Sequence, residues 1–318
     1  MERIIRTNQV FLYTIITIIF AGIVQLGQLS SNGAILTLIS QVILALPSVL
    51  FLYNEQHIMK LRREVLKEQG TGRSISTVLC LNKIRPGNII LLVLLTYSVM
   101  PVISMINAFS QLVTKASIKE TMQQISYKNP FAISLFCIAI VPAILEELVY
   151  RGVFYQEYRK VKPRSAILLS SFLFAILHLN IEQFIYAFIM GILFSLVIEA
   201  TDSLYSTIIM HFVFNANSVI LLYMVPEILE NTETLPMGVR EIFASYGFAA
   251  LIGGVVAFAI YRQIAKNCGR LDRVTDLLQG KRIEQEKMHR PRLVTPSLAI
   301  AIGICIVIIT LNEIAAWG

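Results

Sequence analysis

Long apolar runs recur along the chain, separated by shorter polar segments, and most of them are long enough to cross a bilayer as a helix. The segment 54–87, between the second and third runs, is polar and basic. The pattern predicts nine helices, at about residues 10–24, 34–53, 88–113, 131–159, 165–179, 182–200, 204–224, 241–264 and 296–311. We therefore expect an all-α fold, a polytopic transmembrane bundle of about eight or nine helices.

Composition supports a membrane protein. Of the 318 residues, 56% are hydrophobic and 15% charged, outside the usual range of soluble domains. We divide the chain into N-terminal transmembrane helices with a basic loop, residues 1–130, central helices, residues 131–224, and C-terminal helices with a basic connector, residues 225–318. The four cysteines lie far apart in the sequence, which indicates neither a disulfide framework nor a thiolate zinc site.

The basic residues predict the orientation. With the N-terminus inside, 23 of the 27 Lys and Arg residues fall in segments on the cytoplasmic side. We expect an integral multi-pass protein of the cell membrane with a cytoplasmic N-terminus, in contact with the lipid bilayer. No Gly-rich or aromatic RNA-binding motif accompanies the net charge of +7, so we expect no nucleic-acid partner.

Two adjacent carboxylates and an arginine lie at the end of the apolar run that begins at Phe131. Ionisable groups at membrane depth are costly and usually functional. On a helix Glu147 and Arg151 are four residues apart and can form an ion pair. Glu146 points about 100° away and has no local partner, which makes it the chemical candidate.

Two histidines, His178 and His211, lie in apolar runs, and Asn215 follows His211 by one helical turn. If the fourth and fifth helices form a hairpin with its tip near Lys162, Glu146 and His178 are each about 24 Å along their helices from the tip. They can therefore face each other at matching depth.

This constellation suits hydrolysis by either of two routes. A carboxylate beside an imidazole can take a proton from water, while a second His and an Asn amide stabilise an oxyanion. Alternatively, Glu146, His178 and His211 could hold zinc and leave a position for water. We favour the metal-free route, because ligand histidines normally have acceptors behind them and Asn215 is the only obvious polar companion.

At these residues the chain resembles the CPBP family, which unites the type II CAAX prenyl proteases with the bacterial Abi proteins. The resemblance covers about Phe131 to Met224 and rests on three motifs in the family's order: Glu146-Glu147-x-x-x-Arg151, Phe174-x-x-x-His178 and His211-x-x-x-Asn215. It implies an intramembrane endopeptidase in which Glu146 and His178 activate water. It also implies that His211 and Asn215 stabilise the oxyanion, and that Glu147 and Arg151 support the site.

We expect the substrate to be a peptide or a lipid-modified protein cleaved near the bilayer. No cofactor is certain, and zinc is the one candidate. A non-catalytic protein of the same fold, such as a bacteriocin-immunity factor or a partner-binding scaffold, is the main alternative. A proton-coupled transporter using Glu146 is a weaker one.

Overall fold

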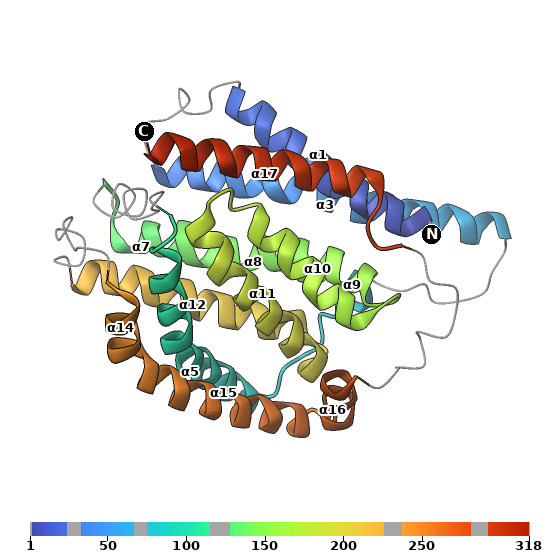
Figure 1. Cartoon of the computed structure of the whole chain (residues 1–318). Helices are drawn as coiled ribbons and strands as arrows, with labels where there is room; N and C mark the ends of the chain where they lie inside the picture. Colours follow the sequence, from blue (N-terminus) through green and yellow to red (C-terminus); the bar gives the residue numbers. More distant parts are fainter. Residues whose placement is uncertain are drawn as a thin grey trace.

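The computed structural model describes residues 2–23, 33–66, 75–114, 128–225, 237–280 and 292–317, and these form a helix bundle (Figure 1). Within them, eight helices are long and apolar enough to cross a membrane. The protein is an integral, multi-pass membrane protein of all-α fold, as the sequence predicts. The elements are α1 (Glu2–Ile23), α3 (Gly33–Leu66), α4 (Ile75–Val78), α5 (Pro86–Ser110), α7 (Phe131–Ser134), η1 (Leu135–Ile140), α8 (Val141–Glu147), η2 (Leu148–Phe154), α9 (Tyr155–Tyr158), α10 (Pro163–Ile176), α11 (Ile181–Thr201), α12 (Leu204–Met224), α14 (Val239–Ile242), η3 (Phe243–Gly247), α15 (Phe248–Asn267), α16 (Leu271–Gln279) and α17 (Pro296–Trp317).

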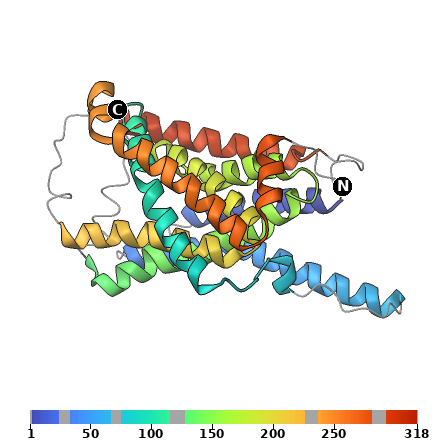
Figure 2. The same ribbon diagram turned by 90° about the horizontal axis from the view of Figure 1, so that it is seen from below.

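All nine predicted segments are helical, but several of their limits differ. The first helix, α1, begins at Glu2, not near residue 10, and the last, α17, continues beyond residue 311 to Trp317. The second helix does not end near Tyr53 but continues as α3 to Leu66, and its far part projects beyond the bundle (Figures 1 and 2). The fifth helix, α10, has only 14 residues and ends at Ile176, not at Leu179. A helix of that length rises about 21 Å, less than the roughly 30 Å hydrocarbon core. The turn after α10 therefore lies within the depth of the bilayer if α10 begins at its surface.

The helices form three layers (Figure 1). The first and last long helices, α1 and α17, pack together beside α3 on one side, and α5 pairs with α15 on the other. Between them lies the central segment 131–224, in which α10 and α11 form a tightly packed hairpin and α12 lies against η1 and α8. The two Glu residues of the central motif are thus enclosed by helices from all parts of the chain.

Apolar residues also cover the outside of the bundle. On α15 a stripe at helical spacing is strongly exposed, with Phe248 at 77%, Leu251 at 69% and Val255 at 65%. The interior, by contrast, holds charged residues such as Arg151 and Glu199, both fully buried. Apolar outside and polar functional groups inside is the arrangement expected in lipid.

The central helix from Phe131 to Tyr158 contains two π-helical stretches, η1 and η2, on either side of α8. Pro142 follows η1, and because proline has no N–H, the carbonyl of Ile138 lacks the usual donor four residues on. Asn215 on α12 supplies one, since its Nδ2 donates to the Ile138 carbonyl at 3.0 Å. This contact ties α12 to the irregular part of the central helix.

Candidate active site

The predicted ion pair forms at the heart of the bundle. Arg151 Nη1 lies 2.9 Å from Glu147 Oε1, and both side chains are completely buried. The same carboxylate oxygen accepts a hydrogen bond from His211 Nδ1, also at 2.9 Å. Glu147 is therefore a junction that joins its own helix to α12, and it holds the His211 ring in one orientation.

The remaining surface of the Arg151 guanidinium is covered by aromatic rings. It lies 4.3 Å from the centre of the Phe174 ring and 5.1 Å from that of Phe194. Among the described residues its Nε and Nη2 have no hydrogen-bond partner. Aromatic faces attract a desolvated cation, so these two rings, from α10 and α11, partly replace water around the charge.

Glu146, for which the sequence showed no local partner, has two polar neighbours in the structure. Its Oε1 accepts a hydrogen bond from Gln41 Nε2 at 2.8 Å, and its Oε2 lies 3.9 Å from His211 Nε2. Gln41 belongs to α3 and lies 105 positions away in the sequence. Glu146 is thus oriented from one side by an amide and from the other by an imidazole, while the part facing away from them borders a cavity.

The sequence predicted His178 inside a helix, but it lies in the turn between α10 and α11. The turn is shaped by Leu179, whose φ of 53° is left-handed, and by Asn180, which caps α11 by accepting from the Gln183 amide. His178 Nδ1 lies 3.0 Å from the Phe174 carbonyl. Since a carbonyl only accepts, Nδ1 carries the proton, and in the neutral ring Nε2 is free to act as a base or acceptor.

Glu146 and His178 share one cavity of about 470 Å³. Its lining also contains the polar side chains of Gln41, Tyr150 and Gln183, while most of the lining residues from α1 and α3 are apolar. The Tyr150 side chain is almost fully buried, and its hydroxyl has no hydrogen-bond partner among the described residues. The cavity therefore combines a carboxylate, an imidazole and an unused hydroxyl donor with room for an apolar chain.

The other two expected residues stand behind this wall. Neither His211 nor Asn215 is among the lining residues of the cavity. His211 reaches it through Glu146, while the Asn215 amide is engaged by the Ile138 carbonyl. Of the six residues singled out in the sequence, Glu146 and His178 line the cavity, and Glu147, Arg151, His211 and Asn215 do not.

The two histidines do have acceptors behind them, contrary to our expectation. His211 uses Nδ1 to bind the Glu147 carboxylate, and His178 uses Nδ1 to bind a backbone carbonyl, as metal-ligating histidines commonly do. The residue types would therefore suit zinc, but their arrangement does not. In the part of the chain that the structure describes, no three His, Cys, Asp or Glu side chains are grouped so that they could hold a metal ion.

Comparison with known families gives one match. Residues 128–217 match a family model described as type II CAAX prenyl endopeptidase Rce1-like. This segment is therefore similar to the type II CAAX prenyl endopeptidases. The family segment runs from just before α7 into α12, so it contains all six residues singled out in the sequence. No curated protein and no solved structure matches the chain.

Two side chains of the site escaped the sequence reasoning. Gln41 lies outside the CAAX protease segment, in the apolar run of α3, where a glutamine among aliphatic residues is a signal in itself. Tyr150 lies inside the motif between Glu147 and Arg151, but a tyrosine in an apolar helix has no distinguishing pattern. Only the structure brings both to Glu146.

Proposed function

We propose that the protein is an intramembrane endopeptidase that hydrolyses a peptide bond with a water molecule activated by Glu146 and His178. The observation that carries the proposal is that both residues line the same cavity. The CAAX protease family of residues 128–217 supports a membrane peptidase with a protein substrate.

In this reaction Glu146 takes a proton from a water held between its carboxylate and His178 Nε2. The water oxygen bonds to the scissile carbonyl carbon, and the carbonyl oxygen becomes an oxyanion. The proton then passes from Glu146 to the leaving nitrogen as the C–N bond breaks, giving a carboxylic acid and an amine. Gln41 and His211 keep the Glu146 carboxylate in position.

The oxyanion requires donors aimed into the cavity. The sequence resemblance assigns this work to His211 and Asn215, and the geometry supports adding Tyr150. Tyr150 lines the cavity and its buried hydroxyl has no partner among the described residues, whereas the Asn215 amide already serves the Ile138 carbonyl. Asn215 would have to exchange that backbone carbonyl for the oxyanion during the reaction.

The apolar wall favours a substrate with a hydrophobic segment or a covalently attached lipid. Side chains of α1 and α3 such as Ile18, Leu36 and Leu44 form that wall. Burial of an apolar chain there would gain about 0.8 kcal/mol per CH₂ group. The scissile bond of such a substrate would lie opposite, next to Glu146.

Cleavage of membrane peptides by purified protein tests the proposal. We expect Glu146→Gln to reduce the rate by at least about 10²-fold, the lower range of general-base catalysis, without loss of folded protein, because glutamine keeps a hydrogen-bonding partner for Gln41. Lys266→Gln, an exposed change on α15, is the control. Equal product from wild type and Glu146→Gln would exclude a catalytic Glu146 and favour the non-catalytic scaffold.

A further inference from the structure

A second cavity, of about 400 Å³, lies at one end of the bundle, near the N-terminus and away from Glu146. It is enclosed by the beginning of α1, the segment around α4, the end of α9, the α11–α12 junction and α16. The described residues that line it include five basic side chains, Arg3, Arg159, Lys160, Arg270 and Arg273, and one carboxylate, Asp202. Arg3 and Lys160 share Glu157 as their partner. The positive charge that remains in excess indicates an anionic ligand.

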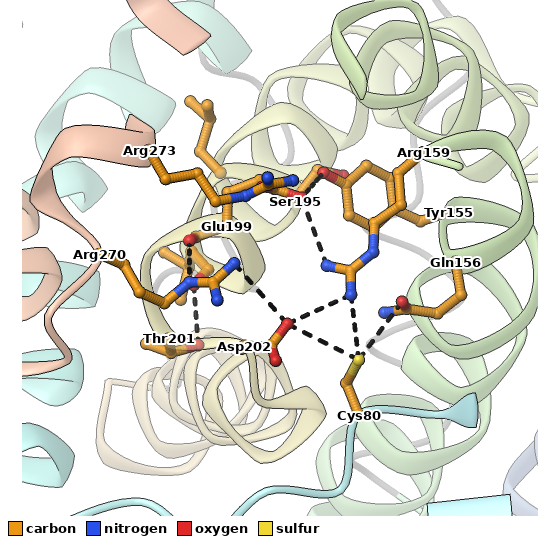
Figure 3. A network of polar contacts seen from close by, with 12 residues as sticks. Cys80, Tyr155, Gln156, Arg159, Ser195, Glu199, Thr201, Asp202, Arg270 and Arg273 are labelled. Carbon is orange, nitrogen blue, oxygen red and sulfur yellow. Dashed lines mark hydrogen bonds and ion pairs between the residues drawn. The ribbon is translucent and has the colours of Figure 1, made fainter. Parts of the chain in front are cut away.

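Arginines of this cavity are held in place by shared carboxylates (Figure 3). Arg159 lies 3.3 Å from Glu199 and 3.2 Å from Asp202, and Arg270 lies 3.8 Å from Asp202. Arg273 also pairs with Glu199. Two carboxylates thus serve three guanidinium groups. The groups are pre-oriented, yet their charge is only partly balanced.

Gln156 gives an independent indication of a ligand. Its side chain is 2% exposed and lines the cavity, and Figure 3 shows its amide directed at the network. Its Oε1 accepts from the Cys80 thiol at 3.4 Å, but among the described residues its Nε2 has no partner. Buried donors are almost always satisfied, so an acceptor on a bound molecule would complete the site.

Cys80 adds no negative charge to this network. Burial raises the pKa of the Cys80 thiol, which outweighs the opposite effect of the nearby Arg159. The thiol therefore stays protonated at neutral pH and acts as a weak donor to Gln156. Cys80 therefore does not balance the positive charge of the cavity, and a bound anion would.

We propose that this cavity binds a phosphate group through Gln156, Arg159 and the basic residues around them. Phosphate offers several acceptor oxygens and matches the planar fork of arginine. The cavity lies at the ends of membrane-spanning helices, where lipid headgroups are found, and basic pockets between such helices are typical headgroup sites. The phosphate can belong to an anionic phospholipid or be free inorganic phosphate.

Thermal unfolding of the full-length protein in phosphatidylcholine nanodiscs distinguishes the sources. Inorganic phosphate is titrated against chloride and acetate at equal ionic strength, and phosphatidylglycerol is added to the nanodiscs in a separate series. A rise in Tm with phosphate supports a site open to free phosphate. A rise with phosphatidylglycerol alone supports a lipid headgroup. Equal effects of chloride, or an effect of acetate without one of phosphate, would overturn the proposal.

Variants give the second half of the test. Gln156→Leu removes the unpaired donor, so we expect the unliganded Tm to be retained and the apparent affinity for the stabilising phosphate compound to fall at least about tenfold. Lys160→Gln should weaken it less, because that side chain is partly exposed. Lys83→Gln, an exposed basic residue outside the cavity, is the matched control. An unchanged affinity in Gln156→Leu would contradict the assigned site.

Discussion

Arg151 shows at the level of one residue how a charge is kept inside a membrane protein. Its single hydrogen-bonded ion pair is with Glu147, and Phe174 and Phe194 cover the rest of the guanidinium. Removal of the arginine would leave the Glu147 carboxylate buried without its cationic partner, with a hydrogen bond from His211 remaining. Breaking a buried pair from one side is far more costly than never forming it.

We therefore expect Arg151→Ala to lower the free energy of unfolding by about 3–5 kcal/mol, together with the yield of folded protein. Denaturation in detergent, followed by circular dichroism, measures the change. Arg262→Ala, which removes an exposed arginine from α15, is the control and should have little effect. If both variants unfold like the wild type, the Glu147–Arg151 pair does not stabilise the bundle.

Gln41 leads to a second prediction at this scale. Gln41 lines the cavity, and its hydrogen bond to Glu146 Oε1 positions the proposed base. Hydrogen bonds to charged groups contribute about 1.5–3 kcal/mol, so we expect Gln41→Leu to lower kcat about tenfold or more with little change in KM. Thr37→Val, which affects only a hydrogen bond within α3, is the control. A change in KM alone would assign Gln41 to substrate binding instead.

How far the sequence predicts the site depends on where each partner lies. The pair of Glu147 and Arg151 is local, and helical spacing alone predicts it correctly. The shared cavity of Glu146 and His178 follows from the hairpin, although His178 lies in a turn. Gln41 could not be assigned to Glu146, because nothing in the sequence sets how α3 packs against α8.

At the level of helices, α12 supplies a hydrogen-bond donor to a backbone carbonyl in the π-helical stretch η1, near Pro142. The Ile138 carbonyl has no α-helical donor, and Asn215 donates to it. The proline was visible in the sequence, as was the asparagine on α12. Their connection was not, because a carbonyl freed by proline can be satisfied by any nearby donor or by water.

A double-mutant cycle tests this connection. Asn215→Ala alone should lower the free energy of unfolding by about 1–3 kcal/mol, since it removes a hydrogen-bond donor from the Ile138 carbonyl. Pro142→Ala supplies an N–H four residues after Ile138, so the double variant should lose less than the sum of the two single changes. Strict additivity would show that Asn215 does not serve Ile138. If stability is rescued but cleavage is not, Asn215 also acts in the reaction.

For the whole molecule, the bundle gathers at one end the segments that the charge pattern assigns to the cytoplasm. Arg3 pairs with Glu157 near the end of α9. Arg159, just after α9, and Arg270, after α15, both pair with Asp202, which follows α11. The α10–α11 hairpin begins and ends at this same end of the bundle. How deeply it enters the bilayer therefore does not affect the side of the membrane on which any other segment lies. A cytoplasmic N-terminus stays our prediction for the orientation.

Metal content is also a property of the assembled bundle, because Glu146 lies on α8, His178 in the turn between α10 and α11, and His211 on α12. Zinc ligation would require all three to converge on one point, and their helices do not place them so in the described structure. The proposed reaction needs only the carboxylate and one imidazole. Each histidine already has its Nδ1 proton bound, which suits zinc ligands and general bases alike.

We therefore expect active protein purified without added metal to contain no stoichiometric zinc and to retain cleavage after treatment with a chelator. Metal analysis of the same preparation used for the cleavage assay makes the measurement direct. Inactive Glu146→Gln, treated identically, is the control: a zinc ligand lost at this position would weaken metal binding as well as activity, whereas loss of a base affects activity alone. Stoichiometric zinc in wild type, reduced in Glu146→Gln and removed together with activity by chelator, would replace the base mechanism with a metal-bound water held by the same three residues.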